Sequence, residues 1–237
     1  MIELLKLMQN RQSVRLPFDA ERPIAKQDLL QILEAGRWAP TAHNMQNFEF
    51  VVVDDKKVLE SIGNIKRPVS ETFVRENYMQ LSFSEGELLK RKTGVLAAMF
   101  PPAWRNPDFR LDENDEDLSV QRPVPVCPVL LVIIYDPCRR APASEGDFLG
   151  ILSLGCVMEN MWLMANSLGI SFHIVSSLSS GSTGKELKSI LNIPENLQVA
   201  FSCRLGYAVS APAKYVRVRR DIEDFVSHNK FGDKGLK

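Results

Sequence analysis

The chain has 237 residues, of which 45% are hydrophobic and 24% charged, as is typical of a soluble globular protein with a sizeable core. Lys plus Arg and Asp plus Glu each number 29, so the formal net charge is zero, which argues against a general electrostatic affinity for nucleic acid. The four cysteines are scattered without a C-x-x-C pair, which disfavours a zinc site or a disulfide scaffold and fits a reducing, cytoplasmic compartment. The amino-terminal residues alternate polar and apolar, so no secretory signal is predicted.

Two helices are predicted first, with a basic segment between them. Apolar residues at helical spacing predict a short helix over 2–10 and a longer one over 26–37. In an extended segment alternate residues share a face, so Arg11, Ser13 and Arg15 would point the same way. Guanidinium and hydroxyl donors match the oxygens of a phosphate. From this pentapeptide alone, a solvated basic turn is the simpler interpretation.

A polar loop and a strong strand come next. Residues 39–48 are dense in side-chain amides and hydroxyls and lead into a strand predicted over 48–53. Such amides can present paired donors and acceptors to the edge of a heterocycle, and they can equally cap turns.

Residues 64–126 form the least regular part of the sequence. Helical patterns occur at 71–82 and 85–98. The loop that follows contains Trp104 and Phe109, and a long loop of this kind is either a lid over a binding site or a disordered segment.

The second half of the chain alternates strands and helices. An unbroken β-branched run predicts a strand at 129–135 that is buried on both faces. The segment 147–168 is apolar almost all round and predicts a core helix; its internal Glu159 and its lack of basic flanks disfavour a membrane span. Further strands are predicted at 171–177 and 197–207, and further helices at 183–191 and 221–226. His173 would then be a core histidine, and the order of elements predicts a single α+β domain.

Several blocks of the sequence resemble the FMN-dependent nitroreductase family. They are Arg11-Gln12-Ser13-Val14-Arg15, Ala39-Pro40-Thr41 with Asn44 and Gln46, the helix end Met164–Ile170, and Leu205-Gly206-Tyr207 followed by Arg217 and Arg219. The resemblance implies a homodimeric α+β fold with a central mixed β-sheet flanked by helices and a long buried central helix. It also implies one domain over 1–237 with a variable lid or insertion at about 64–126.

The resemblance further implies that FMN binds at the subunit interface. Arg11, Ser13, Arg217 and Arg219 match the phosphate positions, and Arg15 matches the residue at the flavin ring edge. Backbone amides near Val175 and Ser176 match those facing the flavin N5. The remaining matches to cofactor-binding positions are Gln12, Thr41, Asn44 and Gln46, the last two often from the partner subunit, with Arg122 the nearest candidate for a further position.

The activity implied by the resemblance is that of an NAD(P)H-dependent oxidoreductase. Reduced nicotinamide would pass a hydride to flavin N5 and leave before a nitroaromatic or quinone takes its place. The cofactor then carries the chemistry, which explains why no catalytic triad, carboxylate pair or metal site is predicted. A specialised dehalogenase-like flavin enzyme and a flavin-binding protein without turnover are the alternatives.

Two departures from the family pattern bear on the site. Asn47-Phe48 stands where many members have proline and tryptophan. The loop that contains Trp104 and Phe109 matches no family motif and would lie at the substrate cover, so the sequence leaves the choice of substrate open.

Overall fold

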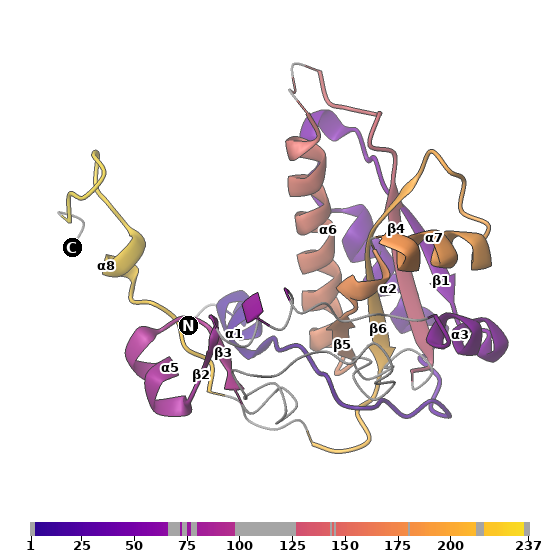
Figure 1. The fold of residues 1–237 in the computed structure, drawn as a ribbon, viewed down its shortest axis with the longest axis horizontal. Helices are drawn as coiled ribbons and strands as arrows, with labels where there is room; N and C mark the ends of the chain where they lie inside the picture. The colour runs from indigo at the N-terminus through magenta and orange to yellow at the C-terminus, as the bar shows by residue number, and fades with distance from the viewer. Residues whose placement is uncertain are drawn as a thin grey trace. The chain divides into compact units, whose positions relative to one another are not determined.

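The computed structural model describes residues 3–65, 72, 75–76, 80–97, 127–142, 144, 146–179, 181–211 and 216–234. Its contacts divide the chain into two compact units (Figure 1). The first unit combines Met1–Arg67 with Gln121–Pro212, and the second combines Pro68–Val120 with Ala213–Lys237. Most of the helix predicted at 71–82 falls outside the described residues, as do Trp104, Phe109 and Arg122.

A four-stranded sheet in the order β1-β4-β6-β5 forms the centre of the first unit. Its strands are β1 (Glu49–Val53), β4 (Val129–Tyr135), β5 (Ser171–Ile174) and β6 (Gln198–Gly206). All three neighbouring pairs are antiparallel, which corrects the expected mixed sheet for the described strands. The reason is topological: β4 and β5 run parallel, but β6 lies between them and runs in the opposite direction.

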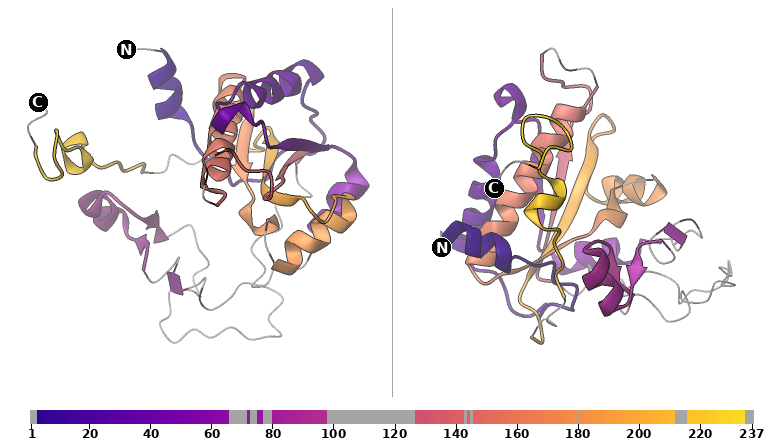
Figure 2. Two further views of the ribbon diagram at one scale, coloured as in Figure 1. Left: turned by 90° about the horizontal axis from the view of Figure 1, so that it is seen from above. Right: turned by 90° about the vertical axis from the view of Figure 1, so that its left-hand side faces the viewer.

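Helices cover both faces of this sheet. On one face α2 (Lys26–Arg37) and α6 (Phe148–Ser167) pack over one core cluster, and on the other face α3 (Lys56–Gly63) and α7 (Gly181–Ile190) pack over a second. Figure 2 shows the strands between α6 and α7. Alternate side chains of β4 enter the two clusters, which confirms a central strand buried on both faces.

The long helix α6 is present as predicted, but in a single chain only one face of it is buried. Its buried residues are Leu154, Val157, Met161, Trp162 and Ala165. Its exposed large apolar residues are Phe148, Ile151 and Leu152. By length and composition α6 could span a membrane, a test that the core helix of a soluble protein also passes. The buried face against the sheet favours the core helix.

The second unit contains a small parallel pair of strands around a helix. β2 (Ser82–Phe83) pairs with β3 (Val95–Leu96), and α5 (Glu85–Arg91) lies between them in sequence. Lys92 adopts a left-handed conformation at φ 55° and ends α5, so the helix predicted over 85–98 is shorter than expected. The second unit also contains α8 (Ile222–Phe225). Three further short elements belong to the first unit, namely α1 (Glu3–Asn10), η1 (Ala42–Asn44) and η7 (Ser176–Leu178).

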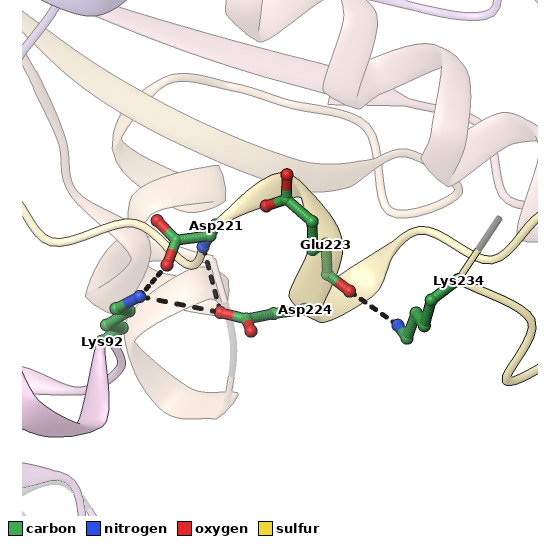
Figure 3. Close-up of polar contacts among 5 residues, drawn as sticks. All are labelled: Lys92, Asp221, Glu223, Asp224 and Lys234. Carbon is green, nitrogen blue, oxygen red and sulfur yellow. Dashed lines mark hydrogen bonds and ion pairs between the residues drawn. The ribbon is translucent and has the colours of Figure 1, made fainter. Parts of the chain in front are cut away.

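Polar contacts join the mid-chain and carboxyl-terminal parts of this second unit (Figure 3). The Lys92 ammonium contacts the carboxylates of Asp221 and Asp224, and the Asp221 contact raises the pKa of Lys92. Lys234 Nζ donates to the Glu223 carbonyl at 2.6 Å. Lys92 therefore ties the end of α5 to the start of α8.

Candidate functional site

The basic segment follows α1 directly, and the Arg11 N–H still donates to the Leu7 carbonyl of that helix at 3.0 Å. Val14 is buried and its N–H donates to the Phe172 carbonyl of β5 at 3.0 Å. Arg15 is exposed, and Arg11 and Ser13 are partly exposed. Val14 is thus the one buried residue among 11–15, whereas the arginine and serine side chains of the segment keep access to solvent. Arg11, Ser13 and Arg15 thus lie in one short segment that the Val14 hydrogen bond attaches to β5.

Two side chains of α6 contact Arg11 and its neighbour. Arg11 Nε lies 3.1 Å from Glu159 Oε1, and its guanidinium carbon lies 4.3 Å from the centre of the Trp162 ring. Trp162 Nε1 donates to the Gln12 carbonyl at 3.3 Å. Sequence reasoning did not assign these α6 residues to the site. The signal in the sequence is the one charged residue of α6, Glu159, with an indole three residues after it.

A buried arginine supports the chain just beyond the basic segment. Arg204 of β6 is fully buried, and its Nη2 donates to the Leu16 carbonyl at 3.1 Å. Its guanidinium carbon lies 4.3 Å from the centre of the Phe18 ring. Its Nε donates to Nδ1 of His173, its cross-strand partner, at 3.2 Å. His173 is therefore the hydrogen-bonded core histidine that the sequence predicted.

The electrostatics of this pair follow from burial. Burial, and secondly the Arg204 charge, lower the pKa of His173 to about 3. Burial lowers the pKa of Arg204 to about 10, so the guanidinium keeps its charge at neutral pH while the imidazole is neutral. The signal for Arg204 in the sequence is a single cation within the largely apolar run 199–207.

The loop between α2 and β1 has an unusual backbone and an internal polar network. His43, Asn44 and Gln46 have positive φ values of 50°, 52° and 45°. Thr41 Oγ1 accepts from the Gln46 N–H at 3.1 Å, and Asn44 Oδ1 accepts from Gln46 Nε2 at 3.2 Å. Left-handed non-glycine residues cost free energy and cluster at functional sites. The loop therefore presents two exposed amide side chains in a fixed arrangement.

Asn47 ties this loop to the segment after β4. Its Nδ2 donates to the carbonyls of Asp136 and Arg139 at 2.7 and 2.8 Å, and its Oδ1 accepts from the Asp136 N–H at 3.2 Å. Proline could make none of these side-chain contacts. Asn47, which departs from the family pattern, thus connects the two loops by side-chain hydrogen bonds.

The other sequence-predicted residues lie elsewhere. The Val175 N–H donates to the Ser202 carbonyl at 2.8 Å, so this amide belongs to the sheet. Ser176 begins η7 and is exposed. Arg217 and Arg219 are exposed and belong to the second unit.

The helix α6 holds both the basic segment and the amide loop, but at different points. Ser153 Oγ accepts from the Ala42 N–H at 3.0 Å, whereas Trp162 contacts Arg11. These two positions are nine residues apart, or about 14 Å along a helix axis. Within one chain, α6 therefore anchors the two groups of residues separately.

Comparison with known proteins gives the family. The model of the Nitroreductase family matches residues 8–207. A relative from Archaeoglobus fulgidus, named "Putative NADH dehydrogenase/NAD(P)H nitroreductase", is 26% identical over 207 residues, which cover 87% of this chain and 86% of that protein.

Two solved structures illustrate the likeness of fold. An FMN-dependent nitroreductase from Clostridium difficile R20291 is 17% identical with a TM-score of 0.60, over 96% of this chain and 99% of that one. A nitroreductase with bound FMN from Bacteroides fragilis NCTC 9343 is 21% identical with a TM-score of 0.59, over 96% and 100% of the two chains. Because the family model spans most of the sequence, the chain belongs to the nitroreductase family.

Proposed function

We propose that this protein is an FMN-dependent oxidoreductase that uses NADH or NADPH as its reductant. The observation that carries the proposal is the cluster of Arg11, Ser13 and Arg15 within five residues after α1, of which Arg15 is exposed and the other two are partly exposed. Membership of the nitroreductase family supports it, as do the relative named for NAD(P)H and the neighbours described with FMN.

The donors of this segment fit a flavin phosphate. Guanidinium groups form short, charge-assisted and often bidentate hydrogen bonds with phosphate oxygens. We assign Arg11 and Ser13, together with Arg217 and Arg219, to the phosphate, and Arg15 to the flavin ring edge. Because the Val175 N–H is bonded within the sheet, Ser176 is the better candidate for an amide that faces the flavin. The other proposed contacts are Gln12, Thr41, Asn44 and Gln46.

The protein's own residues then bind and orient, and the cofactor carries the redox step. When bound, FMN supplies hydride transfer from NAD(P)H to an acceptor of the nitroaromatic or quinone class, in alternating half-reactions. Arg15 would place a cation beside the ring, where it stabilises negative charge on the reduced cofactor. We further propose that both units belong to one domain, with 64–126 as its variable insertion.

We also propose that the protein is a homodimer with two flavin sites at the interface. The exposed apolar residues of α6 and the separate anchoring of the two residue groups along α6 support this. In a dimer, Asn44 and Gln46 of one subunit would complete a site built on Arg11 of the other.

The test is the visible spectrum of the purified protein, followed by anaerobic titration with NADH and NADPH. We expect a yellow protein whose flavin bleaches with one of the two donors and recovers on addition of a quinone or nitroaromatic. A protein that binds FMN but is reduced by neither donor would be a flavin-binding protein without this activity. A colourless protein that also fails to bind added FMN would contradict the proposal.

The assignment of the phosphate residues has its own test. We expect the double variant Arg11→Ala, Arg219→Ala to bind FMN at least about tenfold more weakly, because each lost charge-assisted hydrogen bond contributes about 1.5 kcal/mol or more. Arg37→Ala, which removes an exposed arginine from α2, is the control. Unchanged FMN affinity in the double variant would contradict the assignment.

A further inference from the structure

Two side chains of α6 fix the arginine that the proposed function assigns to the phosphate. Glu159 and Trp162 are three residues apart and therefore project from neighbouring positions on one face of the helix. Both contact Arg11, at 3.1 Å to Glu159 Oε1 and at 4.3 Å to the centre of the Trp162 ring. We propose that they are positioning residues that preorganise Arg11 for the flavin phosphate. This inference rests on the proposed function, because it assumes that Arg11 binds that phosphate.

Trp162 is itself held in place. It is 8% exposed, and its ring stacks on Phe172 at 5.2 Å between centroids with an interplanar angle of 17°. Its Nε1 donates to the Gln12 carbonyl next to Arg11. An indole restrained in this way provides a rigid surface for a guanidinium, whose stacking on aromatic faces is favourable. An arginine ordered before binding loses less conformational freedom on binding.

Glu159 orients Arg11 by a different interaction. Its Oε1 contacts one nitrogen of a guanidinium that carries five N–H donors, so contact with a carboxylate and contact with a phosphate are chemically compatible. The carboxylate charge would nevertheless repel a phosphate bound to the same arginine. Glu159 therefore both orients Arg11 and lowers its affinity for phosphate. Glu159→Gln separates these effects, because it keeps the oxygen acceptor and removes the charge.

The experiment measures the dissociation constants of FMN and riboflavin for the flavin-free protein by fluorescence titration. Riboflavin lacks the phosphate, so the ratio of the two constants isolates the phosphate contact. We expect Trp162→Phe to weaken FMN binding about fivefold, the equivalent of a partly desolvated cation–π contact, and to change riboflavin binding less than about twofold. We expect Glu159→Gln to tighten FMN binding about threefold, and added salt to diminish the gain.

The chain offers a matched control on α2. Arg37 pairs with Glu34 and lies 5.4 Å from the centre of the Trp38 ring, and this second Arg-Glu-Trp group is exposed. Glu34→Gln and Trp38→Phe remove the same chemical groups outside the proposed phosphate site. Both should leave the ratio of FMN to riboflavin affinity unchanged.

Arg11→Ala distinguishes a failure of the proposed phosphate site from a failure of the positioning inference alone. If this variant keeps the full preference for FMN over riboflavin, Arg11 does not bind the phosphate and both proposals fail. If it loses the preference while Trp162→Phe and Glu159→Gln keep it, only the positioning inference is overturned. Equal weakening of FMN and riboflavin by Trp162→Phe would likewise overturn it, in favour of a general structural role. Should circular dichroism show that Trp162→Phe does not fold, Glu159→Gln decides. Tighter FMN binding by this variant supports the inference, and unchanged or weaker FMN binding overturns it.

Discussion

His173 of β5 has a neutral imidazole that accepts a hydrogen bond from the buried guanidinium of Arg204 on β6. Burial and the Arg204 guanidinium lower the pKa of His173 to about 3, far below the ordinary value of 6.5. In the unfolded chain the His173 imidazole binds a proton below about pH 6.5, whereas in the folded chain it binds one only near pH 3. The His173 contribution to stability is thus fully present above pH 6.5 and is lost as the pH falls from there toward 3.

We expect His173 to make the protein acid-sensitive. Between pH 8 and pH 5 the free energy of unfolding should fall by about 2 kcal/mol on account of this residue. The reason is that pH 5 lies about 1.5 pH units below the pKa of the histidine in the unfolded chain, and each unit corresponds to about 1.4 kcal/mol. His173→Asn offers an amide oxygen to Arg204 and cannot be protonated, so its stability should depend less on pH. Urea unfolding at both pH values measures the difference. The same pH dependence in His173→Asn as in the wild type would contradict the linkage, and His43→Asn, at an exposed position, is the control.

The four cysteines differ in burial, and we expect their reactivity to differ accordingly. Burial raises the pKa of Cys127 to about 12 and raises that of Cys203 as well, whereas Cys138 is exposed. Only the thiolate reacts rapidly with disulfide reagents. We therefore expect Cys138 to be labelled first by such a reagent at pH 8, with Cys127 and Cys203 labelled only after unfolding. Loss of the fast phase in Cys138→Ser would confirm the order, and its persistence would contradict it.

At the scale of elements, the segment after the basic motif packs on the end of β6. The Asp19 N–H donates to the Tyr207 carbonyl at 2.8 Å, and Phe18 forms an isolated bridge with Ala208. Gly206 permits this approach, because a Cβ there would lie 2.7 Å from Pro128 Cδ and 3.0 Å from Phe18 Cβ. The glycine of the Leu205-Gly206-Tyr207 block is thus needed for close packing of the chain.

We expect Gly206→Ala to lower the free energy of unfolding by about 1–3 kcal/mol, since it overpacks a site lined by a proline ring and a β-carbon. Gly86→Ala is the control, because a Cβ at Gly86 in α5 meets no atom within 4 Å. Chemical denaturation of both variants gives the comparison. Equal stability of Gly206→Ala and the wild type would contradict the prediction and would show that the segments of Phe18 and Pro128 move to accommodate the added methyl group.

At the scale of the whole molecule, α6 exposes an apolar face. Phe148, Ile151 and Leu152 are 69%, 52% and 56% exposed and lie at helical spacing. Large exposed apolar patches commonly mark protein–protein interfaces. The proposed dimer would bury this face and so complete the burial of the central helix.

We expect the wild type to have twice the mass of one chain in solution and Leu152→Glu to be a monomer, because a charge at this face opposes burial. Sedimentation or light scattering measures the mass. The monomeric variant should also bind FMN more weakly if the partner contributes Asn44 and Gln46. Leu30→Glu, at an exposed apolar position of α2, is the control. A wild-type monomer would contradict the proposed interface.

Local sequence patterns predicted most of the elements. The helix at 26–37 and the strand at 129–135 match the structure in their bounds, because apolar periodicity and breakers act over a few residues. Where a local turn overrode the pattern, the prediction was wrong. The helix expected over 85–98 ends at Arg91, because Lys92 takes a left-handed conformation.

The sequence by itself thus determined the family resemblance and the order of most of the elements. Only the tertiary structure decided that Glu159 and Trp162 contact Arg11, that Arg204 faces His173, and that one side of α6 is exposed. These contacts join residues far apart in the chain. They depend on strand register and on the placement of α6 over the sheet, which periodicity within a short window does not specify.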